Sequence, residues 1–152
     1  MASQQFCTFS VDQLFFGVKV LQVQEVIRLQ TMTVVPQASS MVRGLINLRG
    51  QIVTAIDLRR RLHLPDRENW EPMNVVIQTD EGAVSLLVDE IGDVLEVSDD
   101  VLESPPTTLK GKVKEVITGV YKLEGRLLLV LDTAKAISVG ESTSKNKEEA
   151  AA

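Results

Sequence analysis

Short segments of five to seven residues, rich in valine, leucine and isoleucine, recur along this chain between turn residues. Such segments bounded by turn residues are typical of β-strands. Four pairs of segments lie close enough in the chain to form hairpins. The expected hairpins join residues 5–11 with 14–18, 44–48 with 51–56, 74–78 with 83–88, and 119–123 with 126–131. Many short strands joined by such turns favour small closed or nearly closed β-barrels.

The segments between these hairpins have other patterns. Apolar residues recur at helical spacing over residues 20–27 and predict a short amphipathic helical turn. Residues 33–36 are expected to be extended, and residues 100–114 to form a polar loop. Small and charged residues over 140–152 predict a disordered tail. The folded domain is therefore expected to span residues 1–139.

Asp57 and Asp132 each follow a predicted strand and precede a helical pattern. An aspartate at this position accepts backbone N–H bonds and caps the helix. We therefore expect short helices over residues 58–63 and 133–137. Two equivalent carboxylates can also do acid–base chemistry if their pKa values are split, but helix capping is the better-supported interpretation.

One motif occurs twice in the chain, at an offset of 75 residues. Residues 42–57 align with residues 117–132, and their apolar positions coincide. The identical pairs are Gly44 and Gly119, Leu48 and Leu123, Gly50 and Gly125, and Asp57 and Asp132. A second offset, of 68 residues, relates residues 23–26 to 91–94. The repeat predicts two similar halves that divide near residues 66–73, and its lack of catalytic residue types indicates a binding scaffold.

Residues 127–131 are apolar without interruption. A strand that is apolar on both faces must be covered on both faces, and the other half of the molecule is the expected cover. The sequence therefore predicts a mainly β fold, in which two small barrels pack on a shared hydrophobic core and short helices accompany them.

Composition agrees with a protein core built mainly from valine, leucine and isoleucine. Hydrophobic residues make up 44% of the 152 residues, but aromatic residues only 4%. The formal net charge of −5 argues against nucleic acid as the main partner, because phosphate binding requires a basic surface. The arginines at 59–61 are the strongest candidates for a local basic face.

Candidates for catalysis or metal binding are few. Cys7 is the single cysteine and His63 the single histidine, and a Cys–His pair could in principle be nucleophilic. Cys7 alternates with Phe9 in a strand pattern, so a buried and inert thiol is expected. The spacing of histidine, cysteine and carboxylate residues does not fit a metal site. We expect no enzyme activity, no cofactor and no metal.

The expected location is the cytoplasm. A single cysteine excludes an intramolecular disulfide and suits a reducing compartment. The first ten residues do not have the charge and apolar pattern of a secretory signal. The sequence shows no apolar run of membrane-spanning length.

Two features are candidates for protein recognition. Arg49 precedes Gly50 in a tight turn, which directs the arginine outward, either into solvent or toward a partner carboxylate. Val23 and Val26 either belong to the core or form the wall of an apolar groove with Glu25 on its rim. A groove of that kind would accept a partner helix.

These residues occur in stretches that resemble a known family. The matching stretches are residues 17–26, Pro36, residues 44–50 and residues 57–58. The pattern G-x-x-N-L-R-G followed by D-L is similar to the CheW family of bacterial chemotaxis coupling proteins, and the resemblance extends from about residue 5 to residue 139. The length of 152 residues favours a member without the kinase or receiver domains found in some relatives.

The resemblance implies two five-stranded SH3-like barrels on a common core. It also implies an adaptor that bridges the histidine kinase CheA, through its regulatory domain, and the cytoplasmic tips of chemoreceptors. Receptor binding is attributed in this family to a groove near the barrel junction, and kinase binding to the barrel ends. Carried over by motif position, the groove residues are Val23, Glu25, Val26, Gly44, Arg49 and Val75. A monomer is expected in isolation, with rings possible in an array.

Two other functions are compatible with twin barrels. A small-molecule or oligosaccharide sensor needs a concave pocket with converging polar groups, for which the sequence offers few candidates beside Trp70. A binder of single-stranded nucleic acid needs stacking aromatic residues on a basic face. The low aromatic content and the acidic charge disfavour it.

Overall fold

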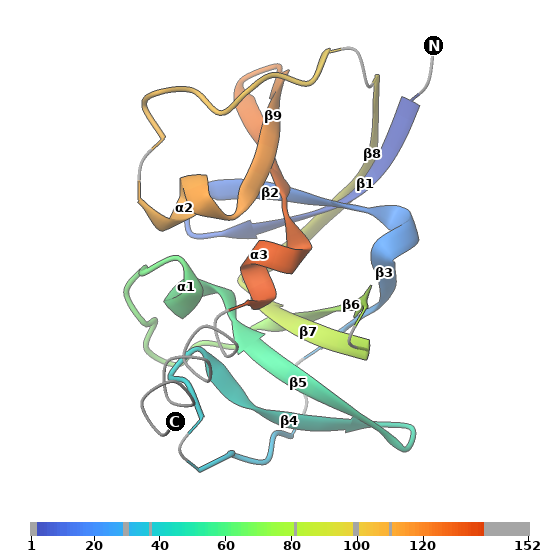
Figure 1. The fold of residues 1–152 in the computed structure, drawn as a ribbon, viewed down its shortest axis with the longest axis vertical. Coiled ribbons are helices and arrows are strands. Elements are labelled where there is room, and N and C mark those ends of the chain that lie inside the picture. Colours follow the sequence, from blue (N-terminus) through green and yellow to red (C-terminus); the bar gives the residue numbers. More distant parts are fainter. Residues whose placement is uncertain are drawn as a thin grey trace, which may run out of the picture.

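The chain was analysed as a computed structural model, which describes residues 3–28, 31–36, 38–80, 82–98, 101–109 and 111–138. The expected tail over 140–152 lies outside this range. Ten strands and a few short helical segments make up the described part (Figure 1). The strands are β1 (Ser3–Val11), β2 (Leu14–Lys19), β3 (Val23–Ile27), β4 (Val42–Leu48), β5 (Gln51–Asp57), β6 (Met73–Thr79), β7 (Gly82–Val88), β8 (Glu90–Ser98), β9 (Ile117–Leu123) and β10 (Arg126–Leu131). The helical segments are η1 (Val20–Gln22), α1 (Leu58–Arg61), α2 (Lys112–Glu115) and α3 (Thr133–Ile137).

The strands form two five-stranded sheets with the same topology. One sheet has the order β8-β1-β2-β10-β9, and the other has the order β3-β6-β7-β5-β4. Each order becomes the other when the first five strands of the chain are exchanged for the last five. Each sheet also takes strands from both halves of the sequence, so a division near residues 66–73 separates neither sheet. The two SH3-like barrels are interlocked.

The repeated motif has the same backbone irregularity in both barrels. In β4 the pairing with β5 shifts between Val42 and Gly44, and in β9 the equivalent shift lies between Ile117 and Gly119. Thr33 forms an isolated bridge with Leu45, the residue after Gly44, and Glu103 forms one with Val120, the residue after Gly119. These two passing segments leave no room for a side chain at either glycine. A Cβ atom on Gly44 would lie 2.6 Å from the carbonyl oxygen of Thr33. The repeated glycines are therefore required for this close approach.

The helical turn expected over residues 20–27 is wrong for most of its length. Only Val20–Gln22 is helical, as a 3-10 turn, and β3 follows it and pairs with β6. The register of this pair shifts between Val23 and Glu25, because a bulge inserts one extra residue. Val23 and Val26 are three residues apart in the sequence, which imitates a helical period, but in β3 they do not share a face: Val23 is half-buried and Val26 is 37% exposed.

Three other boundaries also differ from the expectation. β8 was not predicted, because most of its residues are exposed and it lacks strong alternation. α2 lies inside and just beyond the loop expected over residues 100–114. α1 ends at Arg61 and not at residue 63. The four predicted hairpins are confirmed.

Both predicted helix caps are confirmed. The carboxylate of Asp57 accepts a hydrogen bond from the Arg60 amide at 3.1 Å, and Asp132 accepts one from the Lys135 amide at 3.1 Å. Each aspartate also donates its own amide to a carbonyl oxygen at 2.7 Å. These bonds turn the chain from the end of a strand into a short helix at the equivalent place in each barrel.

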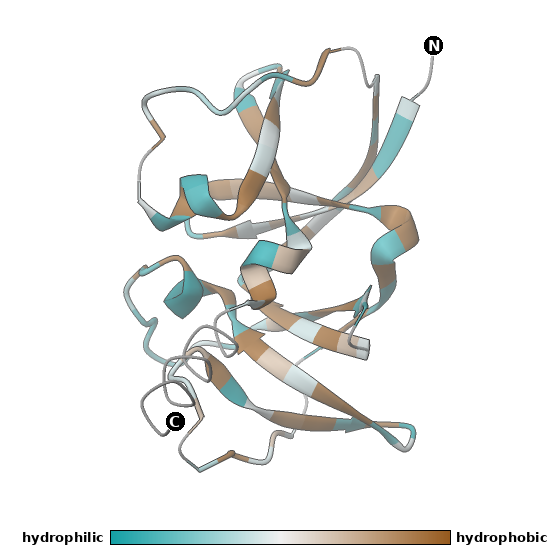
Figure 2. Cartoon of the chain, viewed as in Figure 1, coloured by the Kyte–Doolittle hydropathy of each residue, from teal (hydrophilic) through white to brown (hydrophobic). Residues whose placement is uncertain are grey.

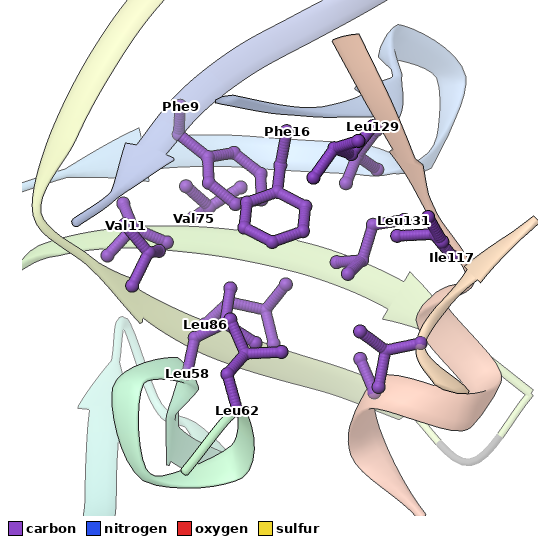
Figure 3. Close-up of a cluster of buried hydrophobic side chains, with 14 of the residues drawn as sticks. Phe9, Val11, Phe16, Leu58, Leu62, Val75, Leu86, Ile117, Leu129 and Leu131 are labelled. Atoms are coloured by element: carbon purple, nitrogen blue, oxygen red, sulfur yellow. The ribbon is translucent and has the colours of Figure 1, made fainter. Parts of the chain in front are cut away.

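Three groups of buried side chains hold the fold together. The largest lies between the sheets and contains residues from both of them, as Figure 3 shows for Phe16 on β2, Val75 on β6 and Leu86 on β7. The other two groups fill the barrel interiors. Figure 2 shows that hydrophobic positions recur along the strands of both sheets. The predicted shared hydrophobic core is thus confirmed. No helix among the described residues is long and apolar enough to cross a membrane.

Candidate functional site

Arg49 lies at the tip of the β4–β5 hairpin, as expected from its turn. Its backbone has a φ of 51°, and Gly50 follows with a φ of 89°. The turn is closed by a 2.9 Å hydrogen bond from the Gly50 amide to the side-chain oxygen of Asn47. The Arg49 side chain is 73% exposed, so it is available to a partner.

The structure also supplies a partner for Arg49 within the chain. Its guanidinium donates to the carboxylate of Glu25 on β3, whose side chain is 19% exposed. The pair joins the hairpin tip to the edge strand at the far side of the same sheet. Because exposed ion pairs contribute little to stability, the contact serves mainly to hold the arginine beside β3.

The other proposed site residues lie at different depths along the same sheet. Val23 is half-buried against the shared core, whereas Val26 is 37% exposed. Val75, opposite Val26 in the pairing of β3 with β6, is 1% exposed and belongs to the core. Gly44 is buried beneath Thr33. The surface part of the site therefore consists of Glu25, Val26 and Arg49, with Val75 and Gly44 behind it.

Exposed apolar residues elsewhere were not selected from the sequence. Ile91 and Val94 on β8 are 37% and 58% exposed. The repeat offset of 68 residues that relates them to Val23 and Val26 was the available signal. Ile52 at the start of β5 is 60% exposed, and its apolar position in the motif gave no indication of which way it faces.

The arginines at 59–61 do not form the expected basic face. Arg59 and Arg61 are buried, 3% and 9% exposed, and only Arg60 reaches the surface, where it pairs with Asp66 at 3.1 Å. Successive residues of a helical turn point in different directions, so each arginine meets a different acceptor. Arg61 donates to the carbonyl oxygens of α3, including that of Lys135 at 2.9 Å.

Arg59 is held by a buried carboxylate between the barrels. Its guanidinium donates twice to Asp89, at 2.9 Å each, and once to the carbonyl oxygen of Pro65 at 2.8 Å. The same carboxylate accepts bonds from the Trp70 indole at 2.8 Å and the Asp12 amide at 2.6 Å. Burial opposes ionisation, but these hydrogen bonds outweigh it and hold the pKa of Asp89 below its usual range.

Cys7 and His63 do not suggest chemistry. Cys7 on β1 is half-buried, which is less than the full burial expected, and burial raises the pKa of its thiol. A thiol with a raised pKa stays protonated and is a weak nucleophile. His63 is exposed after α1, with a φ of 58°. The described residues contain no group of three or more histidine, cysteine or carboxylate side chains that fits a metal ion.

Two interlocked SH3-like barrels, with an arginine-tipped hairpin beside an edge strand, define the structural class. Comparison with known proteins identifies the family: the CheW-like domain model matches residues 5–141, and the chain belongs to that family. A chemotaxis protein CheW of Bacillus subtilis is 31% identical and covers 97% of this chain and 95% of its own. One of Treponema pallidum is 29% identical over 90% of this chain and 84% of its own.

A solved structure confirms the architecture. The crystal structure of the scaffolding protein TtCheW from Thermoanaerobacter tengcongensis superimposes with a TM-score of 0.77 at 22% identity. The match covers 86% of this chain and 89% of that one. The fold expected from the repeat and from the family resemblance is thereby confirmed.

Proposed function

We propose that this protein is a non-catalytic adaptor in bacterial chemotaxis, which couples the regulatory domain of the kinase CheA to the cytoplasmic tips of chemoreceptors. Membership of the CheW-like family supports the chemotaxis role. The observation that carries the proposal is the surface formed by Glu25, Val26 and Arg49, where an apolar edge strand adjoins a fixed arginine.

This surface can contribute to recognition in two ways. Val26 presents apolar area that a partner helix would bury, which provides affinity. Arg49 presents a guanidinium whose position is set by Glu25, so a partner carboxylate can pair with it in one register. Small interfaces of this kind are individually weak. Simultaneous binding of receptor and kinase raises their effective concentration, which accounts for ordered assembly on the cytoplasmic side of the membrane.

The proposal is tested by titrating the full chain against a receptor cytoplasmic fragment and, separately, against the kinase regulatory domain. Binding to both is expected. If the chain bound neither the receptor fragment nor the kinase regulatory domain, the adaptor function would be refuted.

The role of Arg49 is tested by Arg49→Ala. We expect receptor affinity to fall about tenfold, which corresponds to the loss of a charge-assisted hydrogen bond, while the melting temperature stays nearly unchanged because the side chain is 73% exposed. The matched control is Glu124→Ala, at the equivalent turn of the other barrel. A parallel loss of stability and affinity would show that Arg49 is structural.

A further inference from the structure

The repeat places two equivalent junctions on the flanks of the molecule, where the barrels meet. Each junction brings together a hairpin turn, a segment that crosses between the sheets, and a short capped helix. The equivalent positions are Asp12 and Asp80 in the turns, Asp89 and Leu21 in the crossing segments, and Arg59 and Ala134 in the helices. We call the junction at Arg59 the closed junction and the one at Ala134 the open junction.

The closed junction is filled by side chains. Arg59 and Asp89 have side chains that are each 4% exposed, and they form a bidentate pair. Asp12 lies 3.4 Å from the same guanidinium, and the Trp70 ring centre lies 5.9 Å from it. An arginine side chain therefore fits between a turn, a crossing segment and a helix in this fold, with a turn aspartate beside it.

The open junction has the same walls but lacks the arginine. It is a cleft of about 490 Å³. Gln22 of η1, Asp80 of the β6–β7 turn and Thr133 of α3 line it, and Ala134 lies where the closed junction has Arg59. Leu21, in the place of Asp89, is 97% exposed. A methyl group thus replaces the guanidinium, and an exposed leucine replaces its main carboxylate.

The acceptors for a guanidinium remain in the open junction. Among the described residues no ion pair involves Asp80. Gln22 donates through its amide nitrogen to the Thr133 hydroxyl at 3.4 Å, and Gln78 donates to Gln24. Both bonds use side-chain nitrogens of glutamines that line the cleft, so neither bond occupies the amide oxygen of Gln22 or Gln78. Asp80, which is exposed, adds a carboxylate-bearing residue to the same lining.

We propose that the open junction binds an arginine side chain from a partner protein, in a segment that also presents an apolar residue to Leu21. The guanidinium occupies the space that Arg59 fills in the closed junction, and it donates to Asp80 and to the side-chain oxygens of Gln22 and Thr133. Two observations identify the occupant as an arginine: the carboxylate of Asp80 is complementary to a guanidinium, and the equivalent closed junction is filled by Arg59. This site is built from residues other than Glu25, Val26 and Arg49, and its test requires neither receptor nor kinase.

The first test uses the peptide acetyl-Leu-Arg-Leu-amide as the probe and amide chemical shifts of the isotope-labelled full chain as the readout. We expect shifts at Gln22, Asp80 and Thr133. Replacement of the peptide's arginine by citrulline, which keeps the shape but removes the charge, is expected to weaken binding about two- to fivefold, as for an exposed ion pair. Equal responses to both peptides, or shifts outside the cleft, would overturn the proposal.

Asp80→Asn should weaken binding of the arginine peptide by the same factor. The matched control is Asp12→Asn, in the equivalent turn of the closed junction, which should leave the affinity unchanged. If the two variants bind the peptide equally, the carboxylate of Asp80 is not the acceptor and the proposal fails. This experiment requires neither receptor nor kinase, so its failure leaves the adaptor proposal intact.

A second test rebuilds the closed arrangement inside the open junction. The double variant Leu21→Asp with Ala134→Arg places an arginine–aspartate pair at the positions equivalent to Arg59 and Asp89. We expect its melting temperature to exceed the value predicted by adding the effects of the single variants, and the arginine peptide to cease binding. Strict additivity together with undiminished peptide binding would contradict the equivalence of the two junctions.

Discussion

At the scale of single residues, the two copies of the motif agree where the backbone imposes a requirement and differ where side chains face solvent. Gly44 and Gly119 are identical because a neighbouring carbonyl oxygen occupies the space of a side chain in both barrels. Arg49 and Glu124 lie at equivalent turns and have opposite charges. The arginine proposed to take part in recognition is therefore present in one barrel only, on a backbone common to both.

The buried pair of Arg59 and Asp89 leads to a prediction about stability. Asp89→Asn would keep the shape of the side chain but leave the guanidinium buried without its counter-charge. We expect the free energy of unfolding to fall by about 3–5 kcal/mol, as for a broken buried pair, measured by chemical denaturation. Asp66→Asn, which affects an exposed pair with Arg60, serves as the control and should change stability little.

The same carboxylate gives stability a pH dependence. The pKa of Asp89 is lower in the folded state than in the unfolded chain, so the folded state binds fewer protons. Its contribution is complete above the ordinary aspartate pKa of about 3.9 and is lost as the pH falls through the lower folded-state value. Burial raises the pKa of Asp57, which acts with the opposite sign. The difference between wild type and Asp89→Asn therefore isolates Asp89 and should shrink as the pH falls below about 4; a constant difference would contradict the assignment.

At the scale of elements, the hairpins were predictable because each pairs two apolar segments that are neighbours in the sequence and are joined by turn residues. β3 was not, because its partner β6 is distant in the sequence and because Val26, an apolar residue on its exposed face, lies at helical spacing from Val23. The tip position of Arg49 followed from its turn, but its pairing with Glu25 did not, since the contact joins residues from distant elements. Val75 was assigned to the groove from the family resemblance, and the structure places it in the core. An apolar residue of a strand that is buried on both faces does not show from the sequence which face it occupies.

The close approach at the repeated glycine predicts the effect of a side chain there. In Gly44→Ala the new methyl group would lie 2.6 Å from the Thr33 carbonyl oxygen. The passing segment would have to move, and we expect a loss of about 1–3 kcal/mol of unfolding free energy, as for other overpacked sites. Thermal and chemical denaturation measure the effect, and Gly119→Ala should behave alike because its contact, with Glu103, is 2.7 Å.

This substitution also separates a structural glycine from one that contacts the receptor. Under conditions where Gly44→Ala is fully folded, we expect its receptor affinity to match that of the wild type, because the residue is buried. A loss of affinity in the fully folded variant would show instead that the receptor approaches the backbone at this position.

At the scale of the whole molecule, the order of the strands makes the two halves of the chain dependent on each other. β1 and β2 complete the sheet that contains β8, β9 and β10, while β6 and β7 form the centre of the sheet that contains β3, β4 and β5. The shared core contains residues of both sheets. Neither barrel can close, and the largest group of buried side chains cannot form, until both halves are present.

This interlocking predicts the behaviour of fragments. Cleavage between Arg67 and Glu68, which are both exposed, would leave five strands in each fragment. Neither fragment alone should show dispersed amide resonances, because each lacks the partners of its own strands and exposes half of the shared core. Mixed in equal amounts, the fragments should associate and recover the spectrum of the intact chain. The cut removes only one covalent connection in an exposed loop, so the complex should unfold in a single transition at a temperature that rises with concentration. Independent folding of either fragment would show that the sequence halves, and not the exchanged sheets, are the units of stability.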